Sequence, residues 1–111
     1  MKIIHGLYNG SFPFFRGVDE DAFVEGMPSQ FTDLLQRQHS NQHFSTVEFT
    51  YAVRIVESAE LVKKYHAIAI THLPDSFNRK VGVKIVTGRI NRAISTLKPY
   101  KKLPATVVII I

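Results

Sequence analysis

An alternating segment in the middle of the chain constrains the fold more than any other feature. From Val47 to Ile55 apolar side chains occupy every second position, and polar or small residues lie between them. Successive side chains of a strand point to opposite faces of a sheet, so this period of two predicts a strand with one buried face. A buried face of this kind must pack against apolar side chains from other parts of the chain. The segment therefore predicts a β-sheet packed against other elements.

Other segments have the composition of further strands. Lys2–Tyr8 precedes an Asn-Gly pair typical of a tight turn. Residues 66–73 are close enough in sequence to pair antiparallel with the alternating segment, and the C-terminal residues 106–111, TVVIII, predict a buried strand. Residues 11–18 are apolar and extended, but their proline restricts them to an edge or irregular strand. Together these segments predict an antiparallel sheet of about four strands.

A short helix is expected to begin near Pro28. Phe31, Leu34 and Leu35 follow the i, i+3, i+4 spacing of a narrow apolar stripe. The polar tract of residues 36–43 indicates the end of this helix and a loop.

A longer helix is expected in the C-terminal third. Asp75 or Ser76 would cap it, and its apolar stripe continues to about Leu97. Gly82 and a second glycine at position 88 each cost a helix about 1 kcal/mol relative to alanine, so they predict either close packing or the close approach of a partner. The many β-branched residues also allow a strand over 81–87. We favour the helix, and hence one α+β domain over residues 1–111.

Composition excludes several classes of protein. The chain has no cysteine, which rules out a disulfide scaffold, a thiolate zinc site and a cysteine nucleophile. Its longest apolar run, residues 107–111, is far shorter than a membrane span needs. The N-terminus lacks the pattern of a signal peptide. We therefore expect no membrane contact and a cytoplasmic location.

Charge is distributed very unevenly along the chain. Residues 1–75 hold six basic and nine acidic residues, a net charge of −3, whereas residues 76–111 hold eight basic residues and no acid. A tract of one sign is an argument about partners rather than about fold. It predicts a basic face for nucleic acid or for an acidic protein surface; the alternative is a solvated face that the acidic residues of 19–25 partly neutralise. The residues expected to form the basic face are Lys80, Lys84, Arg89, Arg92, Lys98, Tyr100, Lys101 and Lys102.

An aromatic cluster near the N-terminus is a second candidate contact surface. Phe12, Phe14, Phe15 and Arg16 are of the types that concentrate binding energy in protein interfaces. The competing interpretation is that the phenylalanines belong to the core.

No catalytic motif is present, so we expect a protein that is not an enzyme and that needs no cofactor. There is no phosphate-binding glycine loop and no nucleophile elbow. His39 and His43 have the i, i+4 spacing of a shared metal site. They lie in the tract expected to leave the helix, so no metal site is predicted.

Residues 72–89, HLPDSFNRKVGVKIVTGR, resemble a pattern found in small accessory proteins of tailed bacteriophages. The matching positions are His72, Pro74, Asp75, Phe77, Gly82, Gly88 and Arg89. The resemblance implies a small phage protein, acting in the host cytoplasm, that modulates a host or phage macromolecule. It implies no reaction.

Two functions of different classes follow. The first is a non-catalytic protein that docks on a host macromolecule and inhibits it, as anti-defence or host-takeover proteins do. The second is a nucleic-acid-binding module that uses the basic helix and the loop after it. Pairing through an exposed edge strand such as TVVIII would also allow a homodimer.

Overall fold

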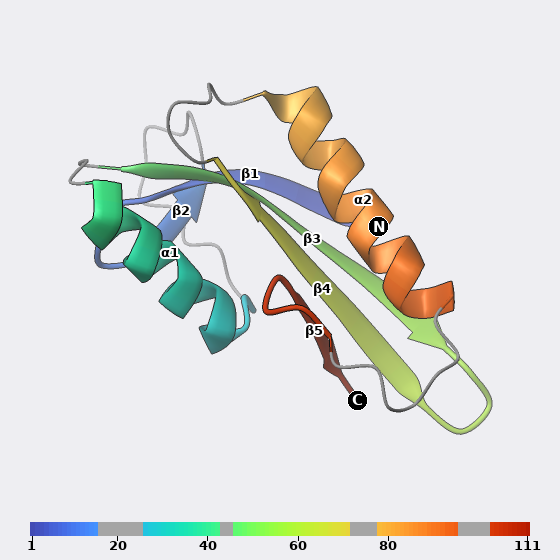
Figure 1. Cartoon of the computed structure of the whole chain (residues 1–111). Coiled ribbons are helices and arrows are strands. Elements are labelled where there is room, and N and C mark those ends of the chain that lie inside the picture. Colours follow the sequence, from blue (N-terminus) through green and yellow to red (C-terminus); the bar gives the residue numbers. More distant parts are fainter. Residues whose placement is uncertain (16–25, 43–45, 72–77, 96–102) are drawn as a thin grey trace.

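The structure is a computed structural model that describes residues 1–15, 26–42, 46–71, 78–95 and 103–111. These residues form one five-stranded sheet and two helices (Figure 1). The sheet order is β2-β1-β3-β4-β5, and every neighbouring pair is antiparallel. The expected α+β fold is confirmed, with five strands in place of about four. The elements are β1 (Lys2–Tyr8), β2 (Pro13–Phe15), α1 (Ser29–Gln42), β3 (Val47–Glu57), β4 (Val62–Ile70), α2 (Arg79–Ser95) and β5 (Val107–Ile110).

The alternating segment forms the centre of the sheet. Odd-numbered residues of β3 enter one buried cluster with α1, whereas even-numbered ones such as Ala52 enter a second cluster with α2. The two helices therefore cover opposite faces, and the protein has three layers (Figure 1). β3 is buried on both sides for much of its length because each of its faces meets a helix.

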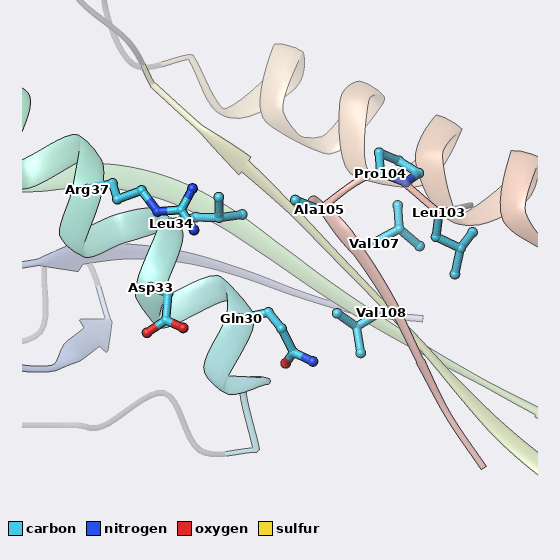
Figure 2. Close-up of a pocket in the computed structure, with 9 residues that line it drawn as sticks. All are labelled: Gln30, Asp33, Leu34, Arg37, Leu103, Pro104, Ala105, Val107 and Val108. Atoms are coloured by element: carbon cyan, nitrogen blue, oxygen red, sulfur yellow. The ribbon is translucent and has the colours of Figure 1, made fainter.

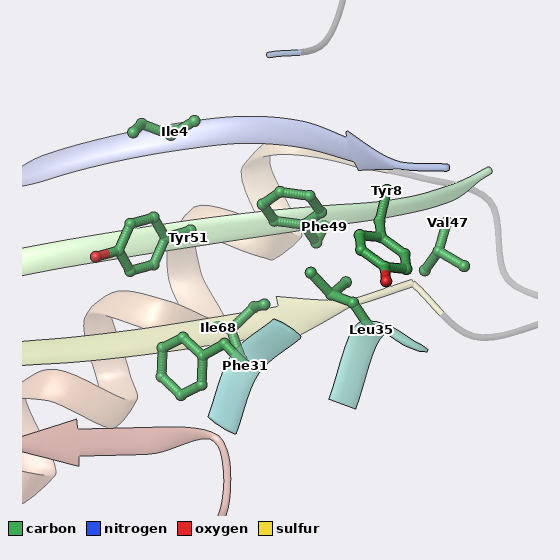
Figure 3. Close-up of a cluster of buried hydrophobic side chains, with 8 residues drawn as sticks. All are labelled: Ile4, Tyr8, Phe31, Leu35, Val47, Phe49, Tyr51 and Ile68. Carbon is green, nitrogen blue, oxygen red and sulfur yellow. The ribbon is translucent and has the colours of Figure 1, made fainter. Parts of the chain in front are cut away.

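The cluster beneath α1 is rich in large side chains. Phe31 and Leu35 of α1 are fully buried, as is Phe49 of β3 beneath them (Figure 3). Full burial of each such side chain stabilises the fold by roughly 1.5–3 kcal/mol. The predicted stripe on this helix is confirmed.

The helix α1 is longer than the sequence suggested. It continues through the polar residues to Gln42, which had been expected to lie in a loop. Contacts with β1 account for part of the difference, because the Tyr8 hydroxyl donates a hydrogen bond of 2.6 Å to Gln36 Oε1. The ring of Tyr8 also meets that of His39 edge to face, with centroids 6.0 Å apart.

The cluster beneath α2 depends on small side chains. Val86 and Ile90 are fully buried against alanines of β3 and β4. Gly82 lies so close to β3 that a Cβ atom there would come within 2.2 Å of Thr50 Oγ1. The predicted close packing is thus confirmed at Gly82, whereas Gly88 is exposed and nothing lies within 4 Å of its added Cβ.

Two boundaries differ from the prediction. The N-cap of α2 is Asn78, whose Oδ1 accepts a hydrogen bond from the Val81 amide; the expected caps, Asp75 and Ser76, lie outside the described residues. The strand β4 begins at Val62 and ends at Ile70, instead of spanning residues 66–73. It begins earlier because a tight turn, in which Ser58 Oγ bonds to the backbone of Leu61, pairs Val62 with Glu57.

Candidate binding surfaces around the second helix

The outward side of α2 combines two kinds of exposed residue. Lys80 and Lys84 are one helical turn apart, and beside them Val81 and Ile85 are 52% and 37% exposed. The helix sequence, Arg79–Ser95, contains no acidic residue. We call Lys80, Val81, Lys84 and Ile85 the docking face. The sequence analysis selected its two lysines, whereas it did not select Val81 and Ile85.

An arginine that the sequence analysis did not select lies beside this helix. Arg54 of β3 is exposed, and its guanidinium donates a hydrogen bond of 3.2 Å to Asn91 Oδ1. Strand alternation could have found it, because Arg54 shares the face of Ala52, which packs beneath α2.

The other predicted basic residues are not all on this surface. Arg92 is exposed near the end of α2, whereas Arg89 is half-buried and turned toward the sheet. The Arg89 guanidinium donates a short hydrogen bond to the carbonyl oxygen of Ile68 in β4. Its burial, and then the charge of Arg92, lowers the pKa of Arg89 from its ordinary value. The loop residues Lys98, Tyr100, Lys101 and Lys102 lie outside the described residues.

The aromatic cluster lies at the β2 edge of the sheet, which is the edge opposite β5. Phe12, Phe14 and Phe15 are all half-buried, and Phe15 packs against the cluster beneath α1. Phe12 and Phe14 meet edge to face, with ring centroids 5.9 Å apart. Arg16 lies outside the described residues. The structure therefore separates this cluster from the docking face.

Two hollows flank Arg37 of α1. The first, the C-terminal hollow, has a volume of about 290 Å³ and lies between α1 and residues 103–108. Figure 2 shows Leu34 and Arg37 pointing from α1 toward Ala105, whereas the Asp33 carboxylate points away from them. The second, the interhelical hollow, has a volume of about 400 Å³; it shares Leu34 and Arg37 and reaches Arg89 of α2.

A buried tyrosine–histidine pair lies in the cluster beneath α1. The Tyr51 hydroxyl is 2.6 Å from His66 Nδ1, and their rings are nearly parallel at 4°. Burial raises the pKa of Tyr51 to about 12, and burial followed by the charge of Lys64 lowers the pKa of His66. Both groups are therefore neutral at pH 7. His66 is 3% exposed, and its Nε2 is buried without a hydrogen-bond partner among the residues that the structure describes.

Within the described ranges, no three histidine, cysteine or acidic side chains are grouped so that they could hold a metal ion. His39 packs against Tyr8, and His43 lies outside those ranges. No described helix is both long and apolar enough to cross a membrane.

Comparisons with known proteins add no family assignment. No family model matches the sequence, and searches of curated proteins and of solved structures returned no match.

Proposed function

We propose that this protein is a non-catalytic binding protein that docks through the outward side of α2 on an acidic protein surface. The observation that carries the proposal is the exposure of Val81 and Ile85 directly beside Lys80 and Lys84. Protein interfaces combine an apolar centre with a polar rim. Two apolar side chains one turn apart, flanked by cations, suit a groove with acidic edges.

Charge complementarity supports the choice of an acidic partner. The helix carries five basic residues and no acid, so its field attracts an acidic surface and repels a basic one. Nucleic acid would neutralise the lysines equally well. It would provide less apolar surface for Val81 and Ile85 to contact, because phosphates dominate its accessible surface. The apolar pair therefore favours a protein.

The biological role proposed here follows from the resemblance to phage accessory proteins. A small protein that covers an acidic surface of a host macromolecule would inhibit or modulate it by occupying its binding site. Such a protein would act in the cytoplasm of the host cell. The bacteriophage pattern over residues 72–89 supports this role.

Nucleic-acid binding is the second candidate, and a specific observation favours it. Arg54 is held at the surface beside Asn91, which adds a cation from the sheet to those of α2. With Lys101 and Lys102, which follow α2 in the sequence, these groups would track a phosphate backbone.

Three double variants distinguish the candidates. Lys80→Glu/Lys84→Glu reverses the charge of the docking face, and Val81→Ser/Ile85→Ser removes its apolar pair. Lys2→Glu/Lys64→Glu makes the same change in net charge at two exposed lysines elsewhere. Circular dichroism should show that all three fold. The binding assays are fluorescence anisotropy with labelled duplex and single-stranded DNA and RNA, and capture from a bacterial lysate.

We expect the wild-type protein to capture one protein stoichiometrically. Both docking-face variants should lose that protein, and the Lys2/Lys64 control should retain it. Nucleic-acid binding instead predicts an affinity that falls with salt by about 0.9 log units per phosphate contact on duplex DNA. It also predicts that Val81→Ser/Ile85→Ser still binds. Capture that is identical in all variants would refute the docking face.

We also propose a homodimer through the free edge of β5. The bond from the Ile68 amide to the Thr106 carbonyl oxygen shows that even-numbered residues of this segment face β4. The backbone groups of Ile109 therefore face outward, as do the carbonyl of Val107 and the amide of Ile111. Around a two-fold axis at Ile109, the Ile109 amide of each copy would donate to the Ile109 carbonyl of the other, and the Ile111 amide would donate to the Val107 carbonyl of the other copy.

The test of the homodimer is sedimentation velocity across a range of protein concentrations. Ile111→Pro removes one outward amide per chain and leaves the β4–β5 register intact, since that register ends at Ile110. We expect it to weaken the dimer. A wild-type protein that is monomeric at every concentration would refute the proposal.

A further inference from the structure

The end of β4 that extends beyond its pairing with β5 directs backbone hydrogen-bonding groups toward the interhelical hollow. The pairing of β5 with β4 ends at Ala67, so the last residues of β4 extend beyond it. Alternate residues of an antiparallel strand direct both backbone groups to the same side. The Ile68 amide and carbonyl face this edge and are taken by Thr106 and Arg89. The backbone amide of Ile70, two residues on, faces the same edge.

Arg89 is a half-buried cation that no described carboxylate neutralises. The influences on its pKa are burial and the like charge of Arg92, both of which disfavour the cation. Its bond to the Ile68 carbonyl uses one of the five donors of the guanidinium. Burying a charge is costly unless it is paired and hydrogen-bonded. An anion beside Arg89 would supply the missing pair.

A second guanidinium borders the same space. The interhelical hollow is lined by Arg37 of α1 as well as by Arg89, with Gln38 and Thr106 as further polar groups. Ile70 and Ile85 contribute aliphatic walls, and none of the described lining residues is acidic. The hollow therefore collects two cations and several donors around an apolar floor.

We propose that the interhelical hollow binds a small molecule that carries an oxyanion, phosphate or carboxylate, on an aliphatic group. The oxyanion would lie between Arg37 and Arg89, within reach of the Ile70 amide. Guanidinium groups present paired donors that match the geometry of such anions. The aliphatic part would cover Ile70 and Ile85. The volume of about 400 Å³ lies in the range of small-ligand sites.

This site is distinct from the proposed docking face. Arg89 lies about 140–180° around the helix axis from Lys84 and Lys80, at 100° per residue. Ile85 alone is common to both, at the boundary between them. The proposal therefore does not depend on the identity of a macromolecular partner.

The experiment titrates the full chain with defined probes and follows backbone amide resonances by nuclear magnetic resonance. Hexyl phosphate and hexanoate combine an anion with an aliphatic group, hexanol lacks the anion, and inorganic phosphate lacks the aliphatic group. We expect one of the first two to bind at least tenfold more tightly than hexanol and inorganic phosphate. The shifts should concentrate at Gln38, Ile70, Arg89 and Thr106. Tighter binding of hexyl phosphate would identify the oxyanion as a phosphate, and tighter binding of hexanoate would identify it as a carboxylate.

Variants decide whether the two arginines hold the anion. Arg37 is exposed on α1, so Arg37→Gln should fold normally and weaken binding about tenfold or more, the effect of one lost charged hydrogen bond. Arg89→Gln should weaken it further, and Arg89→Lys retains the charge if the glutamine variant is unstable. Arg79→Gln removes an exposed arginine of α2 outside the hollow and should bind normally. The proposal is overturned by absence of saturable binding of both anionic probes, or by unchanged affinity in Arg37→Gln.

Discussion

Replacing Gly82 with alanine tests how α2 lies on the sheet. An added Cβ would stand 2.2 Å from Thr50 Oγ1 and 3.0 Å from Thr50 Cβ. Thr50 is 1% exposed, and its hydroxyl is bonded to His5 Nδ1 at 3.1 Å. Turning the hydroxyl aside would break that bond, and no rotation of the side chain moves its Cβ. The helix must therefore shift away from β3.

The magnitude follows from opposing effects. Overpacking a core by one methyl group costs about 1–3 kcal/mol, and loss of the hydrogen bond costs about 1 kcal/mol. The greater helix propensity of alanine returns about 1 kcal/mol. We expect Gly82→Ala to lower the free energy of unfolding by about 1–3 kcal/mol. For a chain of this size, this corresponds to a fall of roughly 4 °C in Tm per kcal/mol.

The assay is urea denaturation followed by circular dichroism, with Gly88→Ala as the matched control. Gly88 lies in the same helix, but nothing stands within 4 Å of an added Cβ there. We expect this variant to be more stable than wild type by about 0.5–1 kcal/mol, because only helix propensity changes. If Gly82→Ala were stabilised to the same extent, the close approach of α2 to Thr50 would be refuted.

Two further predictions concern the buried pair in the cluster beneath α1. Burial lowers the pKa of His66 in the folded chain below its ordinary value of 6.5. As the pH falls, His66 therefore becomes protonated in the unfolded chain at a higher pH than in the folded chain. Its contribution to stability is therefore complete above pH 6.5 and is lost below it, by at most about 1.4 kcal/mol per pH unit. Urea midpoints between pH 7.5 and 5.5 should fall less steeply in His66→Gln, and parallel profiles would contradict this origin. Tyr51→Phe should cost about 1–3 kcal/mol at pH 7, because the hydroxyl bonds to both His66 and the Gly26 carbonyl; a melting temperature equal to that of wild type would show that these bonds contribute nothing.

Elements with a strong local pattern were predictable. The strand Lys2–Tyr8 was expected with the bounds that the structure shows, and β3 was expected from Val47 with its alternation. The helix α2 prevailed over the competing strand because its buried residues repeat with the period of a helix. In each case the side chains that determine the element are neighbours in sequence.

Elements supported by contacts with other elements were predicted less well. The start of β4 contains two lysines and lacks a clear alternation, and its pairing with β3 places it in the sheet. The end of α1 is polar, and its contacts with Tyr8 of β1 lie outside any local window. Both errors arose where contact with another element overrides a weak local preference.

The candidate site divides in the same way. The sequence alone determined that the C-terminal third is basic, that α2 carries Lys80 and Lys84 on one side, and that a glycine permits close packing. Only the tertiary structure decided that the two helices cover opposite faces and that the pairing of β5 with β4 stops at Ala67, before the end of β4. That offset leaves the Ile68 carbonyl available to Arg89. The bond turns Arg89 away from the basic surface, and Arg89 lines the same hollow as Arg37. The physical reason is that helical periodicity specifies the direction of a side chain, whereas burial and pairing depend on what the rest of the chain brings to meet it.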